Sequence, residues 1–206
     1  MTQEIELKLN INPADTARFV AHPLLQSVIE RQRLRLVSVY YDTPALTLMQ
    51  QRAALRVRLA GTRWIQTIKI GGGAVNGLHS RPEWEVELTD QHPQPSLFTD
   101  PIVTQLLTTE LTHQLTPIFQ TVFWRDTWLL DFNGAKIEVA LDQGKVLSLA
   151  QATPICEVEL ELKHGDAQQL TELAQALGQV ITLTPDSVSK AQRGYALYQN
   201  QISTSS

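Results

Sequence analysis

The chain has 206 residues, of which 43% are hydrophobic and 18% are charged, and its formal net charge is −4. This length and apolar content suit one large domain or at most two small ones, and the negative balance disfavours a general binder of nucleic acid or anionic membranes. The single cysteine, Cys156, excludes an internal disulfide and a multi-cysteine zinc site. No apolar run approaches the roughly 20 residues of a membrane span, and the acidic start lacks a signal-peptide pattern, so we expect a soluble cytoplasmic protein with no membrane partner.

Alternation of apolar and charged residues with a period of two runs through much of the chain. The alternating segments lie at 4–9, 55–59, 83–88, 137–142 and 157–162. Segments rich in Val, Ile, Leu and aromatic residues add strand candidates at 31–41, 63–70 and 117–132. Such alternation is typical of strands with one apolar and one polar face, and the short polar connections favour antiparallel pairing. We therefore expect about eight strands, and an antiparallel sheet of that size often closes into a barrel.

Helices are expected in fewer places than strands. They are predicted from Pro13 onward, from an Asp166 N-cap to Gly178, and at 187–199. Residues 96–111 are expected to form one helix or two helical turns around Pro101. The helix at 187–199 is expected to carry one apolar face, formed by Val188, Ala191, Tyr195 and Tyr198. No internal repeat or linker divides the chain, which indicates one domain over residues 1–200 and a disordered tail over residues 201–206.

The charged members of these strands are segregated by sign. The acidic positions are Glu4, Glu6, Glu85, Glu157 and Glu159, and the basic positions are Lys8, Arg56, Arg58, Lys69 and Arg125. The ordinary interpretation places a charged face in water and the apolar face on a core. However, like charges at i and i+2 on one face repel unless opposite charge lies between them. A closed barrel with the charged face inside would bring both signs together in a tunnel, with helices covering the apolar exterior.

A tunnel lined by both signs suits a phosphate chain. Arginine binds phosphate oxygens in a bidentate manner, whereas carboxylates repel phosphate unless divalent cations bridge the two. Oxygen-only ligands favour Mg²⁺ or Mn²⁺, so these residue types indicate metal-assisted phosphoryl transfer.

Other motifs are less informative. Gly71-Gly72-Gly73 lacks the Gly-Lys-Ser/Thr of a phosphate loop, so a flexible hairpin connection is expected there. The five histidines show no metal-ligand spacing and are expected at surface or loop positions. Cys156 lies on the apolar parity of its strand and is expected to be a buried, inert thiol.

Several motifs together carry a resemblance to a known family. They are Glu4-Ile5-Glu6-Leu7-Lys8 (ExExK), LRVR at 55–58, TIK at 67–69, Arg125, LDQG at 141–144, CEVELELK at 156–163 and SKAQRGY at 189–195. With them the chain resembles the CYTH superfamily, the triphosphate tunnel metalloenzymes, from residue 2 to about 198. It looks especially like the bacterial inorganic triphosphatases. The resemblance implies an α+β fold in which an eight-stranded antiparallel barrel encloses a charged tunnel.

The resemblance also implies roles for individual residues. The metal ligands would be Glu4, Glu6, Asp142, Glu157 and Glu159, holding Mg²⁺ or Mn²⁺. The triphosphate-binding residues would be Lys8, Arg56, Arg58, Lys69, Arg125 and Lys190. Glu4, Glu6 and Lys8 would be catalytic, the two glutamates through a metal-bound water and Lys8 by orienting that water or the terminal phosphate. Glu161 shares the parity of Glu157 and Glu159, which leaves open which two of the three bind metal. A helical wheel places Lys190 opposite the apolar face, so a solvated lysine is the alternative there. Glu85, Glu138 and Arg193 are further residues for the tunnel lining, without an expected contact to the substrate.

The implied activity is metal-dependent hydrolysis of inorganic triphosphate to pyrophosphate and phosphate, with no nucleic-acid partner. Class IV adenylate cyclases and thiamine triphosphatases share the scaffold and remain alternatives, as does a binding module that retains polyphosphate without turnover. Several bacterial inorganic triphosphatases carry a histidine-rich helical CHAD domain after the tunnel domain. This chain stops where that domain would begin, which leaves a stand-alone and a truncated member both open. The sequence does not indicate an oligomeric state.

Overall fold

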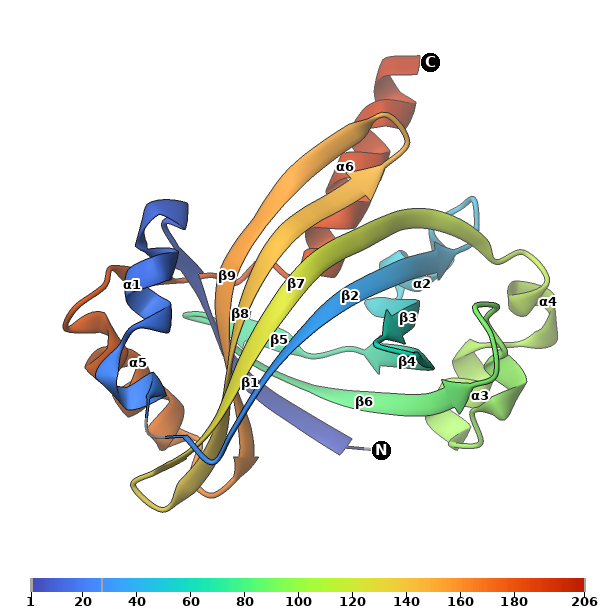
Figure 1. The fold of residues 1–206 in the computed structure, drawn as a ribbon. Helices are drawn as coiled ribbons and strands as arrows, with labels where there is room; N and C mark the ends of the chain where they lie inside the picture. Colours follow the sequence, from blue (N-terminus) through green and yellow to red (C-terminus); the bar gives the residue numbers. More distant parts are fainter. Residues whose placement is uncertain (1, 27, 206) are drawn as a thin grey trace.

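Eight strands of the computed structural model, which describes residues 2–26 and 28–205, form a closed antiparallel barrel (Figure 1). The strands are β1 (Thr2–Ile11), β2 (Glu30–Asp42), β3 (Ala53–Ala60), β4 (Arg63–Ile70), β6 (Leu78–Leu88), β7 (Thr116–Phe132), β8 (Ala135–Ser148) and β9 (Gln151–His164). Their order around the barrel is β1-β9-β8-β7-β2-β3-β4-β6, and the pairing of β6 with β1 closes the ring. The predicted α+β barrel is therefore confirmed.

Two short strands extend the barrel wall where no strand was predicted. β5 (Gly73–Val75) pairs with β6, and β10 (Leu183–Pro185) pairs with β1. Each has only three residues, too few for a period-two pattern to appear in the sequence. β5 also places the last glycine of Gly71-Gly72-Gly73 in a strand.

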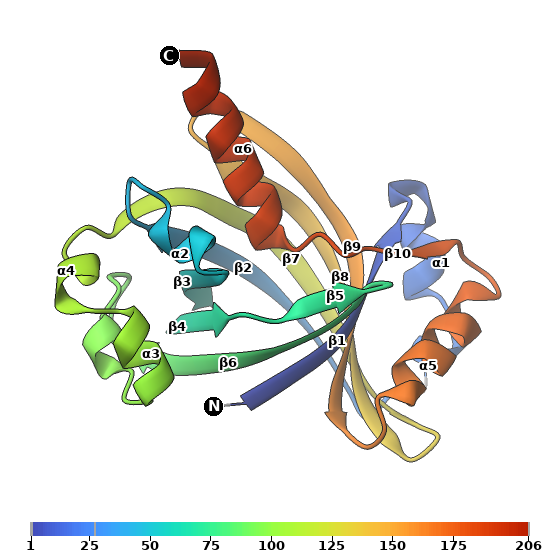
Figure 2. The ribbon, with the colours of Figure 1, turned by 180° about the vertical axis from the view of Figure 1, so that it is seen from behind.

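Helices cover the apolar exterior of the barrel (Figures 1 and 2). Phe19 of α1 (Thr16–Val20) and three leucines of α5 (Gln168–Gly178) pack on buried residues of β1, β7, β8 and β9. On the other side, α2 (Thr47–Gln50), α3 (Pro101–Leu106) and α4 (Thr109–Thr112) supply leucines and Val103 to a cluster with β3, β4 and β6. Short 3-10 turns η1 (Pro13–Asp15), η2 (Pro23–Leu25) and η3 (Pro95–Leu97) precede or connect these elements. The predicted segment 96–111 thus forms three short elements, η3, α3 and α4, rather than one continuous helix.

The C-terminal helix α6 (Lys190–Ser205) differs from its prediction at both ends. Ser189 and Gln192 form a reciprocal capping box, with the Ser189 Oγ accepting from the Gln192 amide at 3.1 Å and the Gln192 Oε1 accepting from the Ser189 amide at 2.8 Å. Val188 therefore precedes the helix and is 46% exposed, so its predicted place on the apolar face is wrong. The helix also continues past residue 200 through Ser205, into the range predicted as a tail.

One end of the barrel interior is filled by aromatic rings and closed by α6. Phe119 stacks on Tyr40, with ring centroids 4.4 Å apart, and meets Tyr195 of α6 edge to face at 5.1 Å. A Cβ atom on Gly194 would lie 2.1 Å from the Phe119 ring, so this close packing needs glycine there.

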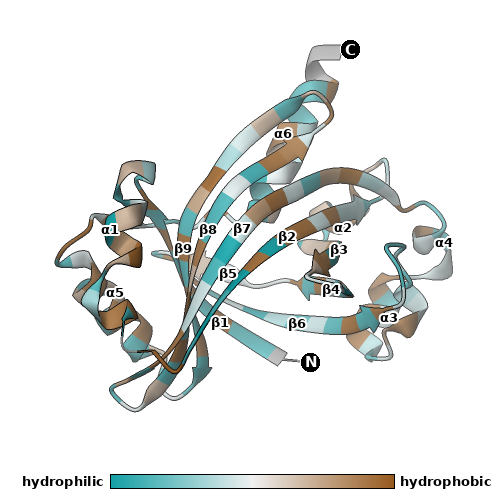
Figure 3. Ribbon diagram, in the orientation of Figure 1, coloured by the Kyte–Doolittle hydropathy of each residue, from teal (hydrophilic) through white to brown (hydrophobic). Residues whose placement is uncertain are grey.

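Hydrophilic and hydrophobic residues alternate along β2, β7 and β8 (Figure 3), and charged residues of the strands line the central cavity. Lys8, Asp142 and Glu157 are at most 1% exposed. The interpretation in which the charged face lies in water is therefore wrong for these positions. None of the helices formed by the described residues has the length and apolar character needed to cross a membrane.

Candidate functional site

The inward faces of the strands converge on one central cavity. Nine of the residues expected in the tunnel line it: Glu4, Glu6, Lys8, Arg56, Arg58, Lys69, Arg125, Glu159 and Lys190. The two remaining predicted residues, Asp142 and Glu157, are fully buried directly behind this lining and contact its cations. The structure thus brings the predicted residues of seven separate segments together.

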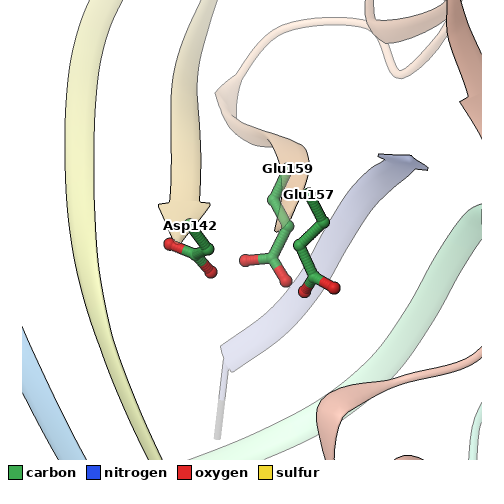
Figure 4. Close-up of side chains that lie close together, drawn as sticks. All are labelled: Asp142, Glu157 and Glu159. Carbon is green, nitrogen blue, oxygen red and sulfur yellow. The ribbon is translucent and has the colours of Figure 1, made fainter. Parts of the chain in front are cut away.

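Asp142, Glu157 and Glu159 form an acidic cluster on the adjacent strands β8 and β9 (Figure 4). A carboxylate oxygen from each lies within 4.8 Å of the others. The Lys190 ammonium lies among them, 2.6 Å from Asp142 Oδ2 and 2.8 Å from Glu159 Oε1, and it also contacts Glu157. Lys190 is therefore buried in an ionic network, and the solvated alternative for it is wrong. The helical wheel failed because Lys190 is the first residue of α6, and its side chain extends into the barrel interior at the start of the helix.

Arginine completes this network. Arg125 Nε and Nη2 donate to the two carboxylate oxygens of Asp142 at 2.7 and 2.6 Å, and Nη2 also contacts Glu159. Although burial opposes ionisation, Lys190 and Arg125 hold the pKa of Glu159 well below its usual range. The same carboxylates raise the pKa of Lys190 against the effect of burial. The acidic cluster therefore already holds the Lys190 ammonium and the Arg125 guanidinium.

Glu157 is the most heavily compensated carboxylate of the cluster. Besides Lys190, it contacts Arg193 and lies 3.2 Å from the Lys8 ammonium. Lys8 itself is 3.3 Å from Asp186 Oδ2 and donates to the carbonyl oxygen of Val188. Both lysines and Arg193 thus tie the start of α6 and the segment before it to the barrel strands.

Glu4 and Glu6 lie on β1, which pairs with β9, and Glu6 is the less well compensated of the two. Lys69 contacts Glu4 at 2.5 Å and Glu83 at 2.7 Å, while Arg81 contacts Glu4 at 3.2 Å and Glu6 at 3.5 Å. Burial, together with the nearby Glu159 and Glu4 carboxylates, raises the pKa of Glu6 to about 7. A further positive charge bound nearby would therefore stabilise the ionised form of the Glu6 carboxylate.

The raised pKa of Glu6 predicts a pH dependence of stability in metal-free protein. The folded state holds the Glu6 proton more tightly than the unfolded chain, whose glutamate has the ordinary pKa of 4.5. The resulting stabilisation is complete below the unfolded pKa and is lost as the pH rises through about 7. Thermal melts in EDTA between about pH 5 and pH 8 should therefore show a falling Tm, with a smaller fall in Glu6→Gln. Equal pH slopes in the two proteins would contradict this environment for Glu6.

Arg56 and Arg58 of β3 form the cationic part of the cavity. Arg58 donates from Nε to Ser38 Oγ at 2.9 Å, and no carboxylate of the described residues lies within 4.0 Å of its guanidinium. Loss of hydration, together with the like charges of Arg56 and Arg125, lowers the pKa of Arg58 to about 10. Arg56 reaches Glu85 at 4.0 Å. A cation held inside a barrel without a protein counter-charge is a place for an anionic ligand.

Several residues of this site were not predicted from the sequence. Arg81 shares the inward parity of Glu83 and Glu85, but Pro82 interrupts the pattern and the strand was expected to begin only at Glu83. Tyr40, Thr67 and Ser189 also line the cavity and were not singled out. His22 and His79 are buried rather than exposed, because His79 lies within β6 and His22 packs at the start of η2. Cys156 is half-buried against the apolar exterior, and burial raises the pKa of its thiol, which agrees with an inert group.

Comparisons with known proteins match nearly the whole chain. The family model of the CYTH domain matches residues 2–195. The inorganic triphosphatase of Haemophilus influenzae is 38% identical over 206 residues, covering 99% of this chain and 57% of the relative, so the chain spans somewhat more than half of that relative's length.

Solved structures support the fold at lower sequence identity. A proposed adenylyl cyclase from Hippeastrum, named for a dominant triphosphatase activity, aligns with a TM-score of 0.69 at 15% identity over 96% of both chains. A proposed adenylate cyclase from Bacillus halodurans aligns with a TM-score of 0.59 at 20% identity, over 94% of this chain and 98% of that one. At this identity the alignments establish a shared fold.

Proposed function

The chain belongs to the CYTH domain family, and from this membership and the charges inside its barrel we propose that it hydrolyses inorganic triphosphate to pyrophosphate and phosphate with a divalent metal ion. The observation that carries the proposal is the pairing of two unlike groups in one cavity. Arg58 is a cation without a carboxylate partner among the described residues, and it lines the same space as Glu4, Glu6 and Glu159. Triphosphate with its metal ions satisfies both groups at once.

The cations of the cavity are proposed to hold the phosphate chain. Arg58 carries the positive charge that carboxylates compensate least, so it would bind the substrate most strongly, and Arg56 lies beside it in the same cavity. Lys69 and Arg125 line the same wall but are engaged with carboxylates, and each would share its charge with the substrate. Such pre-positioned cations orient the chain and stabilise negative charge on the leaving pyrophosphate.

The carboxylates fit a Mg²⁺ or Mn²⁺ site because their donors are all oxygen atoms, which these ions prefer. The residues proposed to hold it are Glu4 and Glu6 of β1, together with Asp142 of β8 and Glu157 and Glu159 of β9. When bound, the ion would neutralise phosphate charge and make a water molecule more acidic. Lys190, which occupies the acidic cluster, supports the fit, because these carboxylates already accommodate a positive charge at 2.6–2.8 Å.

Lys8 is proposed to act near Glu157. Its ammonium is almost completely buried and engages Glu157, Asp186 and the Val188 carbonyl. These contacts support a positioning role for Lys8, which holds Glu157 and the chain segment before α6 in place. Orientation of the attacking water or the terminal phosphate by Lys8 would require exchange of one of these partners.

A substrate comparison tests the proposal. Phosphate release should be measured with Mg²⁺ or Mn²⁺ from inorganic triphosphate, ATP and thiamine triphosphate, with the ATP reactions also assayed for cyclic AMP. We expect a strong preference for inorganic triphosphate that EDTA abolishes. Cyclic AMP from ATP would instead identify a cyclase, a preference for thiamine triphosphate would identify a thiamine triphosphatase, and tight metal-dependent binding without release would identify a binding module.

Removing one charge at the Glu4–Glu6 wall should impair turnover without unfolding the protein. We expect Glu6→Gln and Lys69→Ala each to lower kcat/KM for triphosphate at least about tenfold, or about 1.4 kcal/mol. Lys145, an exposed lysine of β8 outside the cavity, supplies the control variant Lys145→Ala. Circular dichroism should show unchanged folding in all three variants. Full activity in Glu6→Gln or Lys69→Ala would remove that residue from the proposed site.

A further inference from the structure

The first part of β2, Glu30–Arg35, runs beside β7 and forms a free edge of the barrel sheet, which we call the β2 edge (Figure 1). This segment pairs with β7 along its whole length, but β3 pairs with β2 only from Leu36 onward. No other strand of the described residues pairs with it. In an antiparallel pair, alternate residues turn their backbone N–H and C=O groups away from the partner strand. The β2 edge therefore offers backbone hydrogen-bonding groups to a strand from another chain.

Three arginines lie on the outward face of the β2 edge. Arg31, Arg33 and Arg35 stand directly opposite Trp128, Asp126 and Trp124 of β7. Trp128 packs on Phe19 of α1 outside the barrel, and alternate residues of a strand share one face, so all three arginines point outward. All three are exposed, and residues two apart on a strand are separated by about 6.8 Å. The edge therefore carries a row of evenly spaced positive charges.

The protein compensates little of this charge. Asp126 Oδ2 lies 3.8 Å from Arg33 Nε, and the Arg33 side chain is still 60% exposed. Arg31 and Arg35 have no carboxylate within 4.0 Å in the part of the chain that the structure describes. Because the whole chain has a net charge of −4, this row is a local exception to its overall charge. A negatively charged partner is attracted to such a row.

Two tryptophans hold guanidinium groups of the row in place. The Arg33 Cζ atom lies 5.2 Å from the ring centroid of Trp124, and the Arg31 Cζ atom lies 5.4 Å from that of Trp128. These cation–π contacts fix the side chains before a partner arrives, so less conformational entropy is lost on binding. Arg33 also lies over the exposed Trp124 ring, which a nucleic-acid base would need for stacking.

The free backbone and the row of charges together fit an extended acidic peptide. Such a peptide can add a strand to an exposed sheet edge, where main-chain hydrogen bonds give affinity and alternate side chains give specificity. Its side chains repeat at the same spacing of about 6.8 Å, so carboxylates at alternate positions would each meet one arginine. A second copy of the same edge would bring arginine against arginine, which is unfavourable. Nucleic acid would use the charges but not the backbone groups.

We propose that the β2 edge binds, by strand addition, an extended segment of a partner protein that carries Asp or Glu at alternate positions. The backbone of Glu30–Arg35 supplies the hydrogen bonds, and the three arginines select the segment by its charge. The inference is independent of the proposed function, because none of these residues lines the central cavity.

Binding of short fluorescein-labelled peptides tests the proposal. The probe alternates glutamate with valine, and two control peptides alternate lysine with valine and glutamate with proline. Proline keeps the spacing of the charges but removes backbone N–H groups that strand addition needs. Fluorescence anisotropy at one ionic strength should give an affinity for the glutamate–valine peptide at least about tenfold higher than for either control, or about 1.4 kcal/mol.

Arg35→Glu should lower the affinity for the glutamate–valine peptide at least about tenfold, because a repulsion replaces an attraction. Lys145→Glu is the matched control, since Lys145 is an exposed residue of β8, a strand with β7 and β9 paired on its two sides. It changes the net charge equally but should change the affinity by less than about threefold. Circular dichroism checks that both variants are folded. In wild type, bound peptide should slow amide hydrogen exchange at residues 30–35.

Several results would overturn the inference. They are equal affinities of wild type and Arg35→Glu, equal affinities for the glutamate–valine and glutamate–proline peptides, unchanged hydrogen exchange at residues 30–35, or no binding of the glutamate–valine peptide. Tighter binding of a single-stranded oligothymidylate than of that peptide would assign the arginines to nucleic acid and also overturn it. Hydrolysis of triphosphate is measured separately, so failure of the inference leaves the proposed function untouched.

Discussion

Replacing Arg58 with methionine should stabilise the metal-free protein and at the same time nearly abolish its turnover of triphosphate. The guanidinium of Arg58 has lost hydration without gaining a carboxylate, and methionine can occupy the space beside the Phe123 ring, which lies 5.8 Å from the guanidinium carbon. We expect a rise in Tm of about 2 to 6 °C and a loss of at least about a hundredfold in kcat/KM. Thermal melts in EDTA and triphosphate kinetics measure the two effects.

Arg56→Met is the matched control, two residues away on the same strand. Although burial opposes it, contact with Tyr40 and the charges of Glu83 and Glu85 raise the pKa of Arg56, so the protein stabilises this cation. Arg56→Met should therefore lose turnover without gaining Tm. If both variants gain stability, or if Arg58→Met loses it, the assignment of Arg58 as an uncompensated ligand-binding cation is wrong.

Lys190→Met should have the largest effect on stability. The change removes the ammonium from among Asp142, Glu157 and Glu159, leaving three carboxylates close together with only their arginine and Lys8 partners. Removing one partner of a buried ion pair costs about 3 kcal/mol, or about 6 to 12 °C in Tm for a protein of this size. Turnover should also fall, because the carboxylates and the start of α6 lose their common partner.

The change in Tm caused by a divalent metal ion is the second measurement on Lys190→Met. A cation that binds the folded state raises Tm by mass action, so Mn²⁺ should raise the Tm of Lys190→Met by more than that of wild type. Lys145→Met is the control, because Lys145 is an exposed lysine of β8 outside the cavity. Loss of one exposed charge there should change the stability by less than about 1 kcal/mol. Equal metal-induced shifts in all three proteins would argue against metal binding at the acidic cluster.

The period-two alternation predicted the barrel well because a strand that lines a charged tunnel needs charged residues on one face and apolar residues on the other. Both faces of β1 and β9 are constrained, by core packing outside and by charge inside, so Glu4, Glu6, Glu157 and Glu159 stand out against their apolar neighbours. β2, β4 and β7 were predicted instead from their content of Val, Ile, Leu and aromatic residues. β5 and β10 were not predicted, because three residues are too few to show a period-two pattern.

The charge partners within the tunnel could not be read from the sequence. Parity places a side chain inside the barrel, but it does not say that Arg58 lacks a carboxylate while Arg125 has two. Lys190 was ambiguous because a helical wheel describes the sides of a helix and not what lies beyond its first turn. Arg81 was hidden by Pro82, although its parity with Glu83 was the signal that would have found it.

The most direct test of the central claim is ³¹P nuclear magnetic resonance of inorganic triphosphate incubated with the protein and Mg²⁺ or Mn²⁺. We expect triphosphate to disappear while pyrophosphate and phosphate appear in equal amounts, and we expect EDTA to stop the reaction. Persistence of triphosphate, or products in any other ratio, would contradict hydrolysis of inorganic triphosphate inside this barrel.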